Sequence, residues 1–306
     1  MTSSGFLLHV GYHKTATSWM QQRLFTPEHG YRQIADHADM FRHIVQPHGF
    51  RFDPSALKAV LAERLIGVEQ GEVPVISSEI LSGHPFHGGH ESDVYAERLH
   101  KIAPNARILI SIRSQMRILP SVYMQYLLRG GTMPYDQFFR GTEAIGYFGF
   151  TPQHFEYDRL VACYQRLFGA ENVYVLTQES LQSDMDAAAA GLADFAGNCR
   201  FYGLKAAARN VYAASYPEYA AAVLRRINHV QVSDLNPAPI LRLGQTPKGL
   251  YRIAGYLLRR PPFTTLFGAK KPVSDHVQRQ FSGSFAASNA RLAKITHNAL
   301  DLTGYD

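Results

Sequence analysis

The chain has 306 residues and a formal net charge of +6, from 31 lysines and arginines against 25 aspartates and glutamates. Hydrophobic residues make up 46% and charged residues 18%, which is ordinary for a globular protein. No stretch approaches the ~18 consecutive apolar residues of a membrane span, and the N-terminus lacks the positive charge of a secretory signal. Two cysteines make no disulfide framework, so we expect a cytoplasmic protein with reduced thiols. The basic balance favours anionic ligands such as nucleotides, acidic glycans or anionic membrane surfaces.

Apolar strands alternate with amphipathic helices through the first two thirds of the chain. The expected strands are residues 6–11, 73–79, 106–113 and 172–177, and the expected helices are residues 17–25, 55–70, 92–103, 116–130 and 157–169. This alternation predicts right-handed crossovers and a P-loop-like α/β fold, a doubly wound parallel sheet flanked by helices. Ligands of such sheets bind at the carboxyl ends of the strands.

The last third of the chain is helical and irregular, with a stretch rich in proline and glycine at 236–272. We expect a single domain, 1–306, with a nucleotide-binding core at 1–200 and a mostly helical C-terminal subregion at 201–306. Segment 248–263 carries apolar residues three or four apart, flanked by arginines. That pattern is typical of a helix facing the core, or of an interfacial helix on anionic lipid, which would place the protein peripherally at the inner membrane.

A polar loop joins the first expected strand to the helix after it. The loop reads His13-Lys14-Thr15-Ala16-Thr17-Ser18-Trp19. Backbone N–H groups at a helix start point toward an anion, the hydroxyls add donors, and Lys14 adds a point charge. The loop is a candidate phosphate cradle, although it lacks the G-x-x-x-x-G-K-[ST] spacing of nucleotide triphosphatases. The alternative is a turn with an exposed lysine and a capping threonine.

A second candidate phosphate contact follows the buried strand 106–113. Arg113 ends that strand, and Ser121 lies eight positions later, near the start of the next helix. An arginine at a strand end suits bidentate binding of phosphate, and a serine in an early helical turn can add a donor. The alternative is a surface arginine paired with an acid, together with a capping serine.

Taken together, "GYHKTATSW" and "LISIRSQMRILPSVY" resemble the PAPS-dependent sulfotransferases, which use 3'-phosphoadenosine-5'-phosphosulfate (PAPS) as sulfuryl donor. The first stretch is similar to the family's K-[ST]-G-T-[ST]-W loop for the 5'-phosphosulfate, except at Ala16. Arg113 and Ser121 match the R-x7-S element for the 3'-phosphate. The C-terminal "SFAASNARLAKITHNALDLTGYD" resembles the tail of bacterial members more weakly, and residues 200–270 hardly match.

The resemblance implies a sulfotransferase whose donor site comprises residues 13–19, Arg113 and Ser121. It implies that Lys14 stabilises or protonates the leaving oxygen, and that a basic C-terminal loop, here represented by Arg209, closes over the 3'-phosphate. The sulfuryl group carries less charge than a phosphoryl group, so no metal is expected to be required. Ala16 is tolerable if its φ is negative and strained if it is not.

The acceptor hydroxyl needs a base, for which Glu79 is the first candidate. It ends the expected strand 73–79, and glycan-modifying members of the family place a glutamate after the corresponding strand. The alternative is a histidine of the downstream loop "GHPFHGGH", either His84 or its neighbours His87 and His90. Their spacing also suggests a metal site, but no cysteine or clear fourth ligand accompanies them. The simplest alternative is a surface loop with a helix-start glutamate.

The sequence therefore favours a cytoplasmic sulfotransferase that acts on a hydroxyl of a carbohydrate or glycolipid. One alternative is a P-loop-type kinase, which the missing triphosphatase motif disfavours. The other is a non-catalytic basic module that binds glycans or nucleic acid. Nucleic acid is not expected as a partner, because the chain lacks the interleaved aromatic and basic residues of a single-strand platform.

Overall fold

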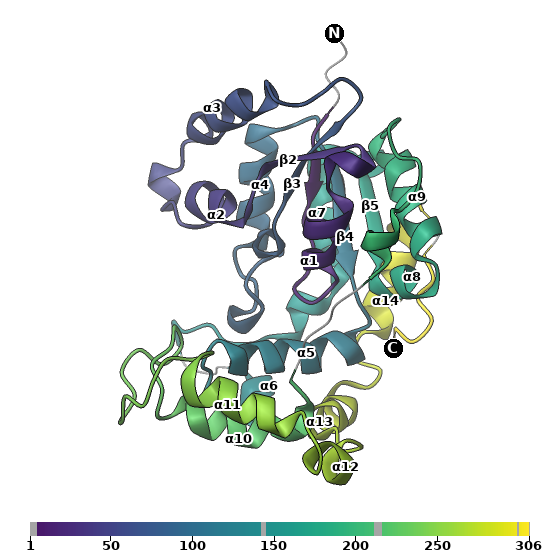
Figure 1. Cartoon of the computed structure of the whole chain (residues 1–306). Coiled ribbons are helices and arrows are strands. Elements are labelled where there is room, and N and C mark those ends of the chain that lie inside the picture. The colour runs from purple at the N-terminus through teal and green to yellow at the C-terminus, as the bar shows by residue number, and fades with distance from the viewer. Residues whose placement is uncertain (1–4, 142–144, 211–215, 299, 306) are drawn as a thin grey trace.

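The computed structural model describes residues 5–141, 145–210, 216–298 and 300–305. Within these residues the chain forms a sheet of five strands, β1 (Leu7–His9), β2 (Tyr31–Ala35), β3 (Val73–Ser77), β4 (Arg107–Ile112) and β5 (Val173–Thr177). All neighbours pair in parallel, in the order β2-β3-β1-β4-β5. Helices flank this sheet (Figure 1), so the predicted α/β fold is confirmed.

Helices follow the strands and dominate the chain after β5. They are α1 (Thr17–Trp19), α2 (His37–Met40), α3 (Pro54–Leu65), α4 (Ser92–Ile102), α5 (Gln115–Leu128), α6 (Tyr135–Arg140), α7 (Tyr157–Phe168), α8 (Gln178–Ser183), α9 (Met185–Ala196), α10 (Ala221–Asn228), α11 (Gly249–Leu258), α12 (Phe263–Phe267), α13 (Pro272–Phe281) and α14 (Ala286–Ile295). The predicted helices that correspond to α4, α5 and α7 are confirmed to within two residues at each end.

Both faces of the sheet are buried, which explains why its central strands are apolar without alternation. In β4, Ile108, Ile110 and Ile112 enter one hydrophobic core, and Leu109 enters a second core on the opposite face. The first core includes residues of α4, α5 and α7, and the second includes residues of α1 and α9. Polar side chains therefore gather where the strands end.

Three expected elements differ from the structure. The predicted helix 17–25 is one α-helical turn followed by a π-helical segment, Met20–Leu24. The predicted helix 55–70 ends at Leu65, because residues 66–67 and 70–71 form turns, with Gly71 at a φ of 85°. The strand expected to end at Glu79 ends at Ser77, opposite the last residue of β1, and Glu79 instead begins a short 3-10 helix, Glu79–Ser82.

The C-terminal helices fall into two groups (Figure 1). Helices α10 and α13 pack against α5, and α11 packs against α10, whereas α14 returns to lie beside α7. Segment 248–263 forms α11 and the start of α12. In the parts of the chain that the structure describes, no helix is both long and apolar enough to cross a membrane.

Candidate functional site

The carboxyl ends of β1, β3 and β4 lie side by side, because β1 pairs with β3 on one side and with β4 on the other. The order of strands reverses at β1, and such a reversal leaves a crevice beyond the strand ends where ligands of parallel sheets bind. The first loop follows β1, Glu79 follows β3, and Arg113 follows β4. The structure thus brings together the three segments that the sequence indicated.

The loop after β1 is held close to β4. The N–H groups of Val10 and Tyr12 donate to the carbonyls of Leu109 and Ser111, at 2.8 and 3.0 Å. Gly11 lies between them with no room for a side chain, since a Cβ there would lie 2.3 Å from Ser111 Oγ. Glycine at this position allows the loop to approach the strand.

The next turn of the loop contains two strained residues. Lys14 and Ala16 have φ values of 69° and 64°, in the left-handed region that non-glycine residues rarely adopt. Ala16 is therefore the strained case anticipated from the sequence. Among the described residues, none accepts a hydrogen bond from the backbone N–H groups of Lys14, Thr15 and Ala16. Successive N–H groups in such a turn form a concavity that binds anions.

A chain of buried polar side chains lies under this loop. Thr15 Oγ1 donates to the Tyr12 carbonyl at 2.6 Å, so it must accept from Ser111 Oγ at 2.7 Å. Ser111 in turn accepts from Nε2 of His9 at 3.0 Å, and Nδ1 of His9 accepts from Ser77 Oγ at 2.8 Å. Burial lowers the pKa of His9 to about 4, which keeps the ring neutral, with one donor and one acceptor.

Sequence reasoning did not find this network. Its signal is that His9, Ser77 and Ser111 are polar residues within otherwise apolar strands. One consequence is that the Thr15 hydroxyl is engaged inside the fold, so that only the backbone N–H of Thr15 remains for a ligand. Trp19 is similarly engaged, because its indole N–H donates to the carbonyl of Ala208 at 2.7 Å. The Trp19 contact joins the first loop to the segment that contains Arg209.

Lys14 and Glu79 interact electrostatically beyond the ends of β1 and β3. Lys14 keeps exposed surface, and Glu79 is half-buried. The pKa of Lys14 is lowered, mainly because the protein displaces water around the ammonium group, with Glu79 opposing and Arg113 adding to this effect. Glu79 Oε2 accepts a hydrogen bond from Gln21 Nε2 at 3.4 Å. Gln21, which the sequence analysis did not single out, therefore helps to position the candidate base.

Arg113 and Ser121 contact each other directly. Arg113 Nη1 donates to Ser121 Oγ at 3.1 Å, and the Ser121 hydroxyl donates to the carbonyl of Arg117 at 3.0 Å. Burial lowers the pKa of Arg113, and Glu179 opposes that effect. Both Arg113 and Ser121 keep some exposure. Within the described part of the chain most of the five guanidinium donors of Arg113 have no protein acceptor, so they are open to an anion.

His84, the alternative base, lies near the first loop. Its ring centre is 6.0 Å from that of His13 and 4.9 Å from that of His87. Burial, with smaller effects from His87 and Arg129, lowers the pKa of His84 to about 4. Burial also lowers the pKa of His13 to about 3. His84 and His13 are therefore neutral at neutral pH. His90 is exposed and packs on a phenylalanine ring instead.

Arg129 is a candidate site residue that the sequence did not reveal. It caps the C-terminus of α5, and its charge lowers the pKa values of Lys14, His13 and His84. In the described ranges it pairs with one carboxylate, that of Asp234, at 3.9 Å. Nothing in the local sequence signals this placement, because it depends on where the far end of α5 lies.

Arg209 is paired elsewhere. It ends the short 3-10 helix Ala206–Arg209, and its guanidinium contacts both carboxylate oxygens of Asp186 in α9, at 2.9 and 3.2 Å. A contact between Arg209 and a bound nucleotide would require this ion pair to open. The neighbouring segment 211–215 lies outside the described residues.

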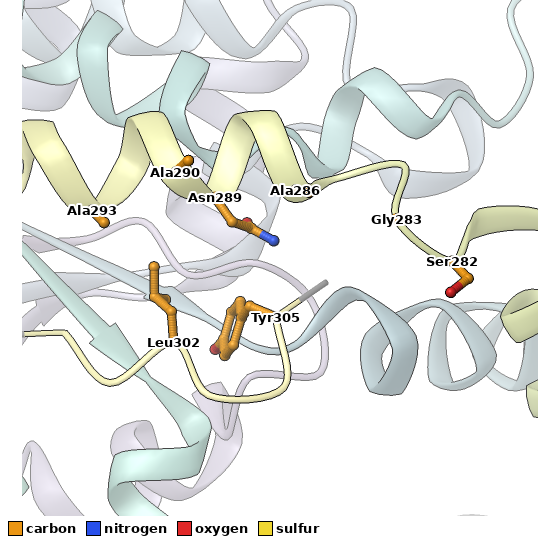
Figure 2. A pocket seen from close by; sticks show the side chains of 8 residues that line it. All are labelled: Ser282, Gly283, Ala286, Asn289, Ala290, Ala293, Leu302 and Tyr305. Carbon is orange, nitrogen blue, oxygen red and sulfur yellow. The ribbon is translucent and has the colours of Figure 1, made fainter.

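A cavity of about 520 Å³ lies between α14 and the C-terminal segment (Figure 2). Figure 2 shows Tyr305 and Leu302 facing Asn289 and Ala293 of the helix. The Tyr305 hydroxyl donates to Glu179 at 2.7 Å, the carboxylate that also acts on Arg113. This cavity is therefore linked to the surroundings of Arg113 through Tyr305 and Glu179.

A second cavity of about 520 Å³ lies beside Tyr12, at the start of the first loop. Its lining includes Tyr12, Gly88, Gly89 and His154. Neither cavity is lined by Lys14, Glu79 or Arg113. Convergence of strand-end residues, and not cavity size, therefore defines the candidate site.

Within 5–141, 145–210, 216–298 and 300–305, no three His, Cys, Asp or Glu side chains are grouped so that they could hold a metal ion. Cys163 and Cys199 are both free thiols.

Comparison with known proteins extends the fold assignment. No protein-family model and no curated protein matches the chain. A crystal structure of a sulfotransferase from Alicyclobacillus acidocaldarius superposes with a TM-score of 0.52 at 15% identity, covering 97% of both chains. A mouse sulfotransferase complexed with PAP gives a TM-score of 0.40 at 12% identity, covering 94% of this chain and 89% of that one. The bacterial match shows a shared fold over nearly the whole chain.

Proposed function

We propose that the protein is a PAPS-dependent sulfotransferase that transfers a sulfuryl group to a hydroxyl of a carbohydrate or glycolipid. One observation carries the proposal: the first loop and the Arg113–Ser121 pair meet at one sheet edge. The fold shared with a bacterial sulfotransferase supports it. Two separate anion contacts at one edge suit a nucleotide with phosphate groups at both the 3' and 5' positions.

The residues present fit such a donor. The N–H groups of Lys14, Thr15 and Ala16 have no acceptor within the described residues, and Gly11 lets the loop sit close to β4. In the proposal these N–H groups hold the 5'-phosphosulfate, together with Lys14 and Ser18. Arg113 and Ser121 hold the 3'-phosphate, for which the Ser121 hydroxyl would rotate away from its present backbone acceptor. Arg209 joins them only if its ion pair with Asp186 opens.

The chemistry proposed for the side chains is an in-line displacement. When bound, the donor supplies the sulfuryl group. Lys14 stabilises negative charge on the leaving oxygen, and this favours the transition state over the ground state. Glu79 accepts the acceptor's proton, and its charge already interacts with that of Lys14. His84 is the second candidate base, since its lowered pKa leaves it neutral.

The acceptor would approach from the loop 84–90, which follows Glu79. Gly88 and Gly89 have φ values of 72° and 58°, so glycine is required for the path of this loop. Lys14, Arg113 and Arg129 make the surroundings basic. A carbohydrate or glycolipid hydroxyl is proposed because Glu79 follows β3, where glycan-modifying sulfotransferases place a glutamate.

The test is transfer of sulfur label from PAPS to a panel of glycans, glycolipids and phenols. We expect a labelled glycan or glycolipid, and far slower labelling with Lys14→Ala. Thermal shifts separate the alternatives, because a ligand that binds only the folded state raises the melting temperature. Stabilisation by ATP with magnesium but not by 3'-phosphoadenosine-5'-phosphate (PAP) would indicate a kinase. Stabilisation by neither nucleotide would indicate a non-catalytic module.

A further inference from the structure

The positive charge of the chain is concentrated in one segment. Residues 236–274 contain no aspartate or glutamate. They contain seven cations: Arg242, Lys248, Arg252, Arg259, Arg260, Lys270 and Lys271. Subtracting these seven charges from the total of +6 leaves −1 for the rest of the chain. The basic character of this protein is therefore a local feature and not a general property of its surface.

The same segment exposes large apolar side chains. They are Ile240, Leu241, Leu243, Leu250, Ile253, Tyr256, Leu257, Phe263 and Leu266, exposed by 37% to 94%. On α11, Leu250, Ile253 and Leu257 follow one another at helical spacing, while Tyr251 and Gly255 are buried against the protein. Single exposed apolar residues are ordinary, but the α11 residues Leu250, Ile253 and Leu257 share one face of the helix, and such a stripe marks an interaction surface.

The cations of the segment are not neutralised by the protein. Within the described ranges, none of the seven forms an ion pair with a carboxylate. Some of them lie on aromatic rings instead. The guanidinium of Arg260 lies 4.1 Å from the ring centre of Tyr256, and Lys270 lies 5.0 Å from that of Phe267. These cations remain available to an external anion.

Internal contacts hold the surface in place. Gln231 is fully buried, and its side chain accepts from the Tyr251 N–H at 2.9 Å and donates to the Lys248 carbonyl at 3.3 Å. These bonds fix the start of α11, which also packs on α10. The apolar stripe of α11 is therefore presented by a packed helix, and α11 and α12 lie at one end of the molecule (Figure 1).

We propose that this basic apolar face, residues 240–271, docks on a membrane that carries anionic lipids. Aliphatic side chains of α11 and α12 would enter the boundary between headgroups and acyl chains, while the flanking arginines and lysines meet the lipid charges. A nucleic acid would use the charges but leave the exposed leucines without a partner. A second copy of the chain would bring seven uncompensated positive charges against seven others. The bilayer satisfies both features of the face.

The experiment is co-sedimentation of the full chain with phosphatidylcholine vesicles, with and without about 30 mol% phosphatidylserine. We expect binding only to the anionic vesicles, and binding at least about tenfold weaker in about 0.5 M salt. The variant Ile253→Ser/Leu257→Ser should lose at least about tenfold in affinity. The matched control is Phe50→Ser/Ile66→Ser, which removes two apolar residues that are 98% and 85% exposed elsewhere. It should bind as the parent does.

Three outcomes would overturn the proposal. If Ile253→Ser/Leu257→Ser keeps its melting temperature and full vesicle binding, adsorption is by charge alone. Equal affinity for duplex DNA, unaffected by the same substitutions, would assign the surface to nucleic acid. Dimerisation in the absence of vesicles, abolished by these substitutions, would assign it to a second copy. The assay measures binding alone, so its result is independent of whether the protein transfers sulfuryl groups.

Discussion

Arg113 donates a hydrogen bond to the hydroxyl of Ser121 at 3.1 Å, so two residues eight positions apart form one unit at the end of β4. The contact exists because α5 begins at Gln115, so that Ser121 lies in its second turn, within reach of the long Arg113 side chain. The guanidinium is thereby held in place before any anion binds, which reduces the entropy lost on binding.

If this unit holds a 3'-phosphate, Arg113→Gln should weaken binding of PAP by at least about tenfold, since charge-assisted hydrogen bonds to phosphate are lost. Ser121→Ala should have a smaller effect, because one neutral donor is removed. Adenosine 5'-phosphate, which lacks the 3' group, is the control and should bind both variants as it binds the parent. Calorimetric titration measures the affinities of both nucleotides for the parent and for the two variants. If Arg113→Gln weakened the binding of both nucleotides equally, Arg113 would not bind the 3'-phosphate.

Lys14→Ala should mainly lower kcat, by about two or more powers of ten, because the ammonium group stabilises the negative charge that develops on the leaving oxygen in the transition state. Donor affinity should change much less. Lys14→Arg is the matched control, since it keeps the charge but changes its geometry. Initial rates at saturating donor, with separate PAP titrations, provide the comparison. Unchanged turnover with weakened binding would show that Lys14 only binds the donor.

Ala16→Gly should stabilise the protein by about 0.5–1 kcal/mol, because glycine adopts positive φ without strain. The larger conformational entropy that glycine loses on folding offsets only part of this gain. The φ of 64° at Ala16 motivates this prediction. Ala16→Val is the opposite control and should destabilise, because a β-branched residue is poorly tolerated at this φ. Urea unfolding measures both. A less stable Ala16→Gly variant would mean that the loop does not carry this strain.

The fold was predictable because most strands of this sheet are buried on both faces and therefore read as short apolar runs. Strand β2 was missed because it is not a continuous apolar run, whereas β5, the other edge strand, reads Val-Tyr-Val-Leu-Thr. The sequence of β2 includes Arg32 and Gln33, which break the apolar pattern. The charge of Arg32 is compensated by Glu72, just before β3, whose carboxylate lies 3.1 Å from the guanidinium. That compensation is a tertiary contact, which no local pattern reports.

The site was predictable where it depends on strand ends and fixed spacing, as for Lys14 and Arg113. Sequence could not show how side chains are oriented: the Thr15 hydroxyl turns inward to Ser111, and Arg209 turns to Asp186. Nor could it place Arg129, whose position depends on the packing of an entire helix.

Acid should destabilise the protein through buried neutral histidines. Burial lowers the pKa of His9 from 6.5 to about 4 and that of His154 to about 3. Between pH 6.5 and 4 the unfolded chain binds protons that the folded chain does not, so stability falls as pH falls and is unaffected above this range. For His9 the loss is on the order of 3 kcal/mol.

Urea unfolding of the parent and His9→Gln at pH 7.5 and 5 tests this. The glutamine can keep a donor for Ser111 but does not titrate, so the loss of stability on acidification should shrink. The control, His229→Gln, changes an exposed histidine and should leave the loss unchanged. An identical loss in the parent and in His9→Gln would show that His9 does not contribute to acid sensitivity.

Glu79 and His84 are the two candidate bases. Glu79 is favoured by its interaction with Lys14 and by the hydrogen bond from Gln21, which orients the carboxylate. If Glu79 takes the acceptor's proton, Glu79→Gln should lower kcat by roughly two to four powers of ten, because general base catalysis is lost. PAP binding should be nearly unchanged. His84→Asn should lower kcat by less than about tenfold, since a side chain that only lines the acceptor site contributes little to proton transfer.

The dependence of kcat/KM on pH distinguishes the two. With Glu79 as base, the acidic limb of the profile disappears in Glu79→Gln and persists in His84→Asn. With His84 as base, the limb lies near its lowered pKa of about 4 and disappears only in His84→Asn. His87→Asn is the control, because it removes a neighbouring imidazole that is not expected to act as the base. If Glu79→Gln, His84→Asn and His87→Asn all keep near-normal rates, the base lies elsewhere, and the acceptor hydroxyl does not bind at the end of β3.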